Sequence, residues 1–124
     1  MEVIHMKLGQ IAVNVENVER AVEFYREVLG LPLLFETNGL AFFQCDDTRL
    51  LLSRPESEEF DHPSSVLYFQ VDDLNVEVSR MKAAGAMFLD EPHQVGTMGN
   101  IEIWMAFFKD TEGNTHALMS EIKI

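Results

Sequence analysis

Few side chains in this sequence are suited to hold a transition metal or to act as nucleophiles. The chain of 124 residues contains four histidines and a single cysteine, Cys45. No HxxxH or HExxH spacing links the histidines, so a metal site would have to use scattered histidine and oxygen ligands. Cys45 ends an apolar stretch, and we interpret it as a small filler of the core rather than a nucleophile. Ser, His and Asp occur without a nucleophile elbow.

Three residues remain as weak candidates for acid–base catalysis: Glu102, His93 and Tyr68. Glu102 is the only carboxylate within the apolar run 101–108. It could act as a general base or as a counter-ion for a cation, and it could equally be an ordinary edge-strand charge. His93 lies in the glycine-containing segment 90–100, which could form a lid or an ordinary surface loop.

The elements that would position these residues occur twice along the chain, each time in the order strand, helix, strand, strand, strand. In the first half, strands are expected at 8–15, 33–36, 40–45 and 49–54. In the second half, they are expected at 66–71, 87–89, 101–108 and 115–122. The helices are expected between Asn17 and Gly30 and between Asp73 and Gly85. The dipeptide Asn38-Gly39 predicts a type I′ hairpin turn.

This repeat predicts one α+β domain spanning residues 1–124. Module one would cover about 8–54, a polar connector 55–65, and module two about 66–122. A hydrophobic fraction of 47% is enough for a folded core and argues against disorder.

Charge and hydropathy narrow the possible partners. Nine basic and 21 acidic residues give 9 − 21 = −12, and such a surface repels nucleic acids and anionic membranes. We therefore expect no nucleic-acid or membrane partner, and the charge slightly favours a cationic ligand. No apolar run reaches the roughly 18 residues of a membrane span. Residues 1–7 lack the pattern of a signal peptide, so a cytoplasmic location is expected.

Four segments in order resemble a known family. They are the strand 10–15, the helix 21–31 with its Phe-Tyr and Leu-Gly pairs, the segment 71–74 and the turn 106–114. Together they resemble the vicinal oxygen chelate superfamily, also called glyoxalase/bleomycin resistance/dioxygenase-like. Thr111 stands where that family usually has proline. The resemblance implies two pseudo-symmetric βαβββ modules that form a half-open barrel around a shared cleft. It also implies a homodimer with ligand sites between modules.

Enzymes of this family hold a divalent metal with one ligand on each of four strands. Matched residue by residue, these positions fall on Gln10, Leu52, Val66 and Ala117, of which three are apolar. One glutamine cannot hold a divalent ion, so no metal cofactor is expected. His116 adjoins Ala117 but would point away from the cleft in an unbroken strand. The alternative is that Gln10 and other ligands hold Ni, Zn, Mn or Fe.

Strand alternation extends the expected cleft beyond these positions. The lining predicted from the sequence consists of Gln10, Asn14, Leu52, Arg54, Val66, Tyr68, Gln70 and Ala117. Trp104 could add a wall for ligand stacking or could seal the two modules together. This mixture is typical of a small-molecule pocket and also of a filled core. The expected function is binding of a small organic ligand without a catalytic metal. A metal-dependent lyase or isomerase and a metal-independent acid–base enzyme are the alternatives.

Overall fold

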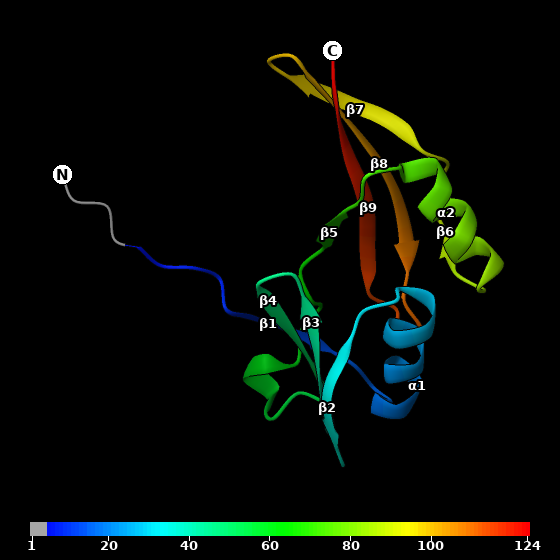
Figure 1. Cartoon of the computed structure of the whole chain (residues 1–124). Coiled ribbons are helices and arrows are strands. Elements are labelled where there is room, and N and C mark those ends of the chain that lie inside the picture. The colour runs from blue at the N-terminus through cyan, green and yellow to red at the C-terminus, as the bar shows by residue number, and fades with distance from the viewer. Residues whose placement is uncertain (1–4) are drawn as a thin grey trace.

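Two β-sheets and two α-helices dominate the fold (Figure 1). The computed structural model describes residues 5–124, and residues 1–4, part of the stretch without a signal-peptide pattern, lie outside this range. The first half contains β1 (Gln10–Asn14), α1 (Val18–Glu23), the π-helix η1 (Phe24–Val28), β2 (Leu33–Thr37), β3 (Leu40–Cys45) and β4 (Thr48–Ser53). The 3-10 helix η2 (Glu58–Phe60) lies in the connector. The second half contains β5 (Leu67–Gln70), α2 (Leu74–Ala83), β6 (Met87–Phe88), β7 (His93–Met98), β8 (Ile101–Lys109) and β9 (Thr115–Lys123).

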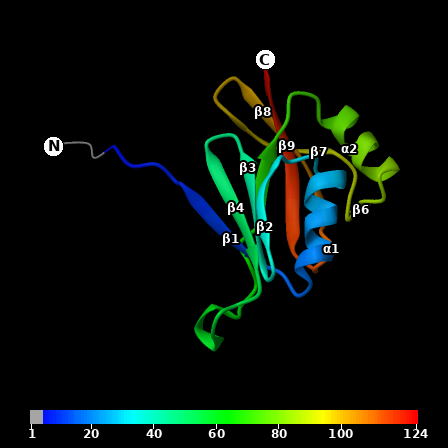
Figure 2. The same cartoon turned by 60° about the horizontal axis from the view of Figure 1, so that its bottom comes forward.

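Each half builds one sheet with the same pattern of strand pairing. The first sheet has the order β1-β4-β3-β2, and the second has the order β5-β9-β8-β6, with β7 also paired to β8 (Figure 2). In both sheets the first strand pairs in parallel with the last strand of its module, and the other pairs are antiparallel. The predicted α+β fold of two related modules is confirmed. No helix within residues 5–124 is long and apolar enough to cross a bilayer.

The helices begin where the sequence predicts. The side chain of Asn17 accepts the backbone N–H of Arg20, and the side chain of Asp73 accepts that of Val76, so both are N-caps. The first helix differs from the prediction because it widens into a π-helix over Phe24–Val28. A π-helix adds one residue to a turn and so rotates the side chains that follow.

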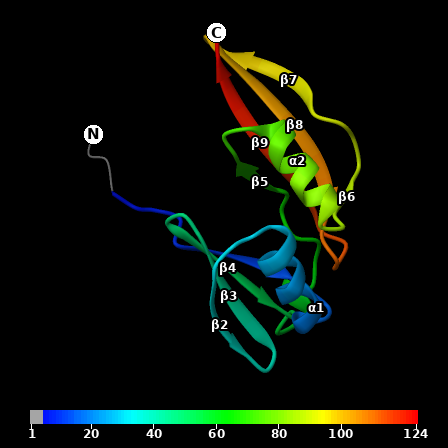
Figure 3. The same ribbon diagram turned by 45° about the vertical axis from the view of Figure 1, so that its right-hand side comes forward.

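Two local predictions are wrong. The segment 90–100, expected as a loop or lid, contains β7, an edge strand that runs beside β8 (Figure 3). All six residues of β7 are exposed. Its polar, glycine-containing sequence lacks the alternation by which a strand is recognised. The turn at Asn38-Gly39 joins β2 to β3, but only Gly39 has a positive φ, +110°. A type I′ turn needs positive φ at both residues, so this turn is of another type.

The two sheets share one core. Val13 and Leu52 from the first sheet and Phe108 and Leu118 from the second belong to a single cluster of buried side chains, together with Tyr25 from η1. In Figure 3, α1 lies against the first sheet and α2 against the second. Each sheet therefore has one face turned to α1 or α2 and the core, and one face that neither α-helix covers. The connector meets this second face of the first sheet at Asn14, whose Nδ2 donates to the carbonyls of Phe60 and His62 at 2.8 Å.

Candidate functional site

The uncovered face of the first sheet carries apolar side chains and a row of polar ones. Register partners lie side by side and share a face of the sheet. The residues of this face are Gln10, Ala12, Asn14, Phe35, Thr37, Leu40, Phe42, Gln44, Arg49, Leu51 and Ser53. Gln10, Arg49 and Gln44 form one row across three strands. Cζ of Arg49 lies 5.8 Å from the centroid of the Phe42 ring, a cation–π contact.

The uncovered face of the second sheet is mainly apolar and aromatic. It carries Tyr68, Gln70, Ile101, Ile103, Met105, Phe107, Lys109, Thr115, Ala117, Met119, Glu121 and Lys123. The rings of Tyr68 and Phe107 meet edge to face with centroids 6.1 Å apart. Ala117 lies between them in the register and is fully buried, so its small side chain lets the two rings meet. Tyr68 remains 49% exposed, which leaves the ring pair accessible.

Most residues that the sequence assigns to the cleft lie on or beside these faces. Gln10 and Asn14 are on the first, and Tyr68, Gln70 and Ala117 on the second. Val66 directly precedes β5 and is 39% exposed.

The placement of Leu52 on the same face as Gln10 is wrong. β1 and β4 pair in parallel with Gln10 opposite Arg49 and Val13 opposite Leu52. Leu52 therefore shares the face of Val13, and its side chain is completely buried in the core. Leu51, one position earlier, takes the place on the uncovered face. A shift of one residue reverses the face of a strand, and this is the physical cause of the error.

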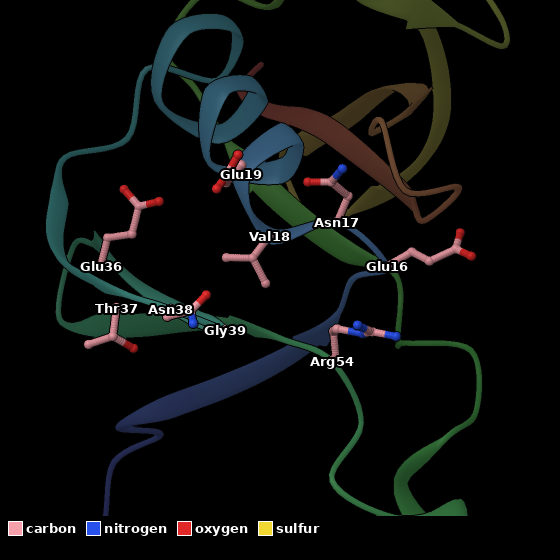
Figure 4. Close-up of a pocket in the computed structure, with 9 residues that line it drawn as sticks. All are labelled: Glu16, Asn17, Val18, Glu19, Glu36, Thr37, Asn38, Gly39 and Arg54. Carbon is pink, nitrogen blue, oxygen red and sulfur yellow. The ribbon is translucent and has the colours of Figure 1, made fainter.

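Arg54 lies beyond the end of β4, at the junction of two surface hollows. The first has a volume of about 420 Å³ and is lined by Glu16, Asn17, Val18, Glu19, Glu36, Thr37, Asn38, Gly39 and Arg54 (Figure 4). The second, of about 580 Å³, is lined by Asn14, Val15, Glu16, Arg54, Pro55, Asp61, His62, Pro63, Glu112, Gly113 and Asn114. Both are open, polar depressions. Arg54 therefore lies near the Asn14 end of the first sheet, and neither hollow contains Gln10, Arg49 or Gln44.

The three acid–base candidates do not converge. Trp104 and Glu102 lie on the face of the second sheet opposite to Tyr68, and Nε1 of Trp104 donates to Oε1 of Glu102 at 3.2 Å. Trp104 packs against the core that the two sheets share, which agrees with the expectation that it seals the two modules together. His93 is in register with Met105 on β8, so two strands separate it from β5 and Tyr68, roughly 14 Å at ordinary strand spacing.

Cys45 borders an apolar hollow between the two modules. This hollow has a volume of about 380 Å³ and is lined by Ile11, Cys45, Thr48, Leu50, Val66, Leu67, Tyr68 and Phe69. Burial and the nearby Asp46 carboxylate raise the pKa of the Cys45 thiol. The thiol is therefore protonated near neutral pH, as expected of a packing residue.

A buried polar cluster links the two modules. The hydroxyl of Tyr25 donates to Oδ2 of Asp110 at 2.7 Å and lies 2.8 Å from Nε2 of His116. Burial lowers the pKa of His116, although the Asp110 carboxylate opposes this shift, and burial raises the pKa of Tyr25. His116 points away from the uncovered face, as predicted. The sequence shows Tyr25 only as part of an apolar helix stripe, so the cluster is not visible there.

A second link joins the turn before β9 to the start of α1. Oε1 of Glu112 accepts the backbone N–H groups of Glu16 and Asn17, and Oε2 accepts Nε of Arg20 at 2.7 Å and the hydroxyl of Thr111. Burial alone would raise the pKa of Glu112, but these hydrogen bonds outweigh it and lower the pKa to about 2. Arg20 thus forms its ion pair across the boundary between the two modules.

The donor set on the uncovered faces does not suit a divalent metal. Within residues 5–124, no three His, Cys, Asp or Glu side chains come together in a way that could hold one. Gln10 has Arg49 and Ala12 as neighbours on its face, and the second sheet offers Tyr68, Ala117 and Gln70. The carboxylate of Glu121 and the imidazole of His93 share the face of Tyr68, but within residues 5–124 they belong to no group of three such ligands. Amide and phenol oxygens alone bind divalent ions weakly.

Comparison with known proteins gives the family. The family model described as Glyoxalase/Bleomycin resistance protein/Dioxygenase superfamily matches residues 7–118. The uncharacterized protein YurT of Bacillus subtilis is 30% identical over 131 residues, covering 88% of this chain and 94% of its own. A glyoxylase-like domain-containing protein of Didymella fabae is 28% identical and covers 94% of each chain.

Solved structures of other proteins have the same fold as this chain. The antibiotic binding protein TnmS3 from Streptomyces sp. CB03234 superposes with a TM-score of 0.77 and 23% identity, covering 98% of this chain and all of its own. A lactoylglutathione lyase from Agrobacterium tumefaciens superposes with a TM-score of 0.71 and 21% identity, covering 92% of each. With the family model matching nearly the whole length, the chain belongs to the glyoxalase/bleomycin resistance protein/dioxygenase superfamily.

Proposed function

We propose that this protein binds a small organic molecule against the uncovered faces of its sheets, without a catalytic metal. The observation that carries this proposal is the ring pair of the half-exposed Tyr68 and the partly buried Phe107 on a mainly apolar face. Apolar and aromatic walls with a few fixed polar groups are typical of small-molecule sites. The structural relative TnmS3 is described as an antibiotic binding protein, which supports the class of function.

A homodimer would complete the site. The two uncovered faces lie on the outer sides of one shared core, so a single chain offers two half-sites. In the proposed dimer, the first sheet of one protomer faces the second sheet of its partner. Exposed apolar side chains such as Leu34 and Phe35 on the edge strand β2 give a reason for association. The proposal includes a cytoplasmic location, where the single cysteine would stay reduced.

The test uses the neutral aromatic probe 2-naphthylmethanol and protein purified without chelator. Its titration, followed by amide shifts in NMR spectra, should perturb Gln10, Tyr68 and Phe107. Tyr68→Ala should weaken binding about fivefold, since an aromatic pair contributes about 1 kcal/mol. Phe60→Ala, which removes an exposed aromatic ring from the connector, is the matched control and should change nothing.

Several results would contradict the proposal. Shifts confined to the hollows around Arg54 would place the site elsewhere. One equivalent of bound Ni, Zn, Mn or Fe would support the alternative of a metal-dependent lyase or isomerase; one structural relative is described as a lactoylglutathione lyase. Sedimentation that shows only monomer, with and without probe, would overturn the dimeric site.

A further inference from the structure

The strand positions of the uncovered face of the first sheet carry no acidic residue, although acidic residues border this face at Asn14. The sequence has 21 Asp and Glu against nine Lys and Arg. The eleven positions of this face that the strand register defines include no carboxylate and one cation, Arg49. A face of net charge +1 on a chain of net charge −12 is the reverse of the overall composition. The overall charge alone would favour a cationic ligand.

The side chain of Arg49 contacts an aromatic ring and, within the described residues, no carboxylate. Its guanidinium lies over the ring of Phe42, at 5.8 Å from the centroid. Gln10 and Gln44 flank it in the same row, and the amide of Gln44 donates to the backbone carbonyl of Asp46. Among residues 5–124, Arg49 takes part in no ion pair. A planar guanidinium stacked on a ring keeps its N–H edge free to bind an acidic group.

Three of the other four arginines are used differently, and the fourth, Arg54, lies in hollows lined by carboxylates such as Glu36 and Asp61. Arg20, Arg26 and Arg80 pair with Glu112, Glu27 and Glu77 respectively. Arg80 also donates to two backbone carbonyls at the end of η1. These contacts are structural, whereas the side-chain hydrogen-bond donors of Arg49 have no protein partner within residues 5–124.

The opposing half-site offers a flat apolar surface. Around the rings of Tyr68 and Phe107, the central positions are Gln70, Met105, Ala117 and Met119, which carry no charge. The charged residues of this face, Lys109, Glu121 and Lys123, lie toward the ends of β8 and β9. A ring system would therefore stack here without a charged neighbour.

We propose that the ligand is a planar aromatic molecule with a carboxylate, bound by Arg49 and the amide of Gln10. The ring system would pack against Phe42 on one protomer and against the Tyr68–Phe107 pair of its partner. This inference rests on the proposed function, because it assumes that the two uncovered faces together form the site.

The test compares three probes with the same ring system: 2-naphthoate, 2-naphthylmethanol and 2-naphthylmethylamine. Calorimetric titration should give at least about tenfold tighter binding of the acid than of the alcohol, and weaker binding of the amine. Arg49→Gln should make the acid and the alcohol equal, while Arg49→Lys should keep part of the preference. Arg26→Gln removes the same charge from an exposed helix position and should leave all three affinities unchanged.

The outcomes separate this inference from the proposed function. Equal binding of the three probes, or preference for the amine, overturns the carboxylate inference and leaves small-molecule binding intact. Binding of none of the probes overturns both. Acid preference that survives in Arg49→Gln assigns the anion to another residue and overturns the role of Arg49. The unfolding midpoint of each variant, compared with that of the unmutated protein, shows that the fold is intact.

Discussion

The hydroxyl of Tyr25 donates a 2.7 Å hydrogen bond to Oδ2 of Asp110, and this bond crosses the boundary between the two modules. His116 extends it, because Nδ1 of its ring accepts the backbone N–H of Leu67 at 3.4 Å. With Nδ1 as acceptor, the ring proton lies on Nε2, which donates to the Tyr25 oxygen. The hydrogen bonds thus run in one direction from Leu67 to Asp110, inside the core that both sheets share.

Removal of the Tyr25 hydroxyl should therefore destabilise the fold. In Tyr25→Phe, Asp110 and His116 both lose a buried partner, so the free energy of unfolding should fall by about 1–3 kcal/mol. Urea unfolding measures the change. Tyr68→Phe removes a hydroxyl from the half-exposed tyrosine and should change stability by less than about 0.5 kcal/mol. Equal effects of the two substitutions would show that the buried cluster adds nothing to the free energy of unfolding.

The burial of His116 predicts that stability falls in mild acid. Burial lowers its pKa in the folded protein, so below about pH 6.5 the unfolded chain takes up a proton that the folded chain does not. The free energy of unfolding should then fall by up to about 1.4 kcal/mol per pH unit. Urea midpoints from about pH 7.5 to about pH 5 should show this slope, and His116→Gln should lack it. His62→Gln, at an exposed histidine, should keep the slope unchanged.

Glu112 should contribute stability in a lower pH range. Its pKa is about 2 in the folded protein, against an ordinary value of 4.5, so its contribution is complete above about pH 4.5 and is lost as the pH falls toward 2. Glu112→Gln should lower the free energy of unfolding near pH 7 by about 1–3 kcal/mol. The gap between variant and unmutated protein should narrow at about pH 3. A gap that stays constant with pH would mean that the carboxylate charge is not what matters. Glu27→Gln, at an exposed surface pair, is the control.

Strand alternation predicted the faces of β1 and β5 correctly but not the face of β4. For Gln10 and Tyr68 the period of two was enough, since the bounds of their strands were close to those observed. β4 begins one residue earlier than expected, at Thr48, and both of its faces carry leucine. Only the pairing of Gln10 with Arg49 shows which leucines face the core. For the same reason Arg49 was absent from the predicted cleft.

The buried cluster could not be predicted because its members are far apart in the sequence. Tyr25 is 85 positions from Asp110 and 91 from His116. Tyr25 fits the apolar stripe of a helix, and Asp110 fits a turn, so each residue has a local explanation that needs no partner. The hydrogen bonds exist only because the helix of one module packs against the last strand of the other.

The donor set of the uncovered faces predicts that divalent metals do not stabilise this protein. A metal that binds only the folded state raises stability by about 4 kcal/mol at a thousandfold excess over its dissociation constant. On its face of the first sheet, Gln10 is the one residue that matches a metal-ligand position of the family, and a single amide oxygen cannot provide such affinity. The protein is first dialysed against chelator, and each metal is then added at about 1 mM: Ni²⁺, Zn²⁺, Mn²⁺, or Fe²⁺ in the absence of oxygen. The thermal unfolding midpoint should stay constant in each case. A rise in the midpoint that Gln10→Ala abolishes would contradict this and favour a metal-dependent lyase or isomerase. A rise that Gln10→Ala leaves intact would place the metal outside these faces, where binding would have no bearing on the proposed ligand site.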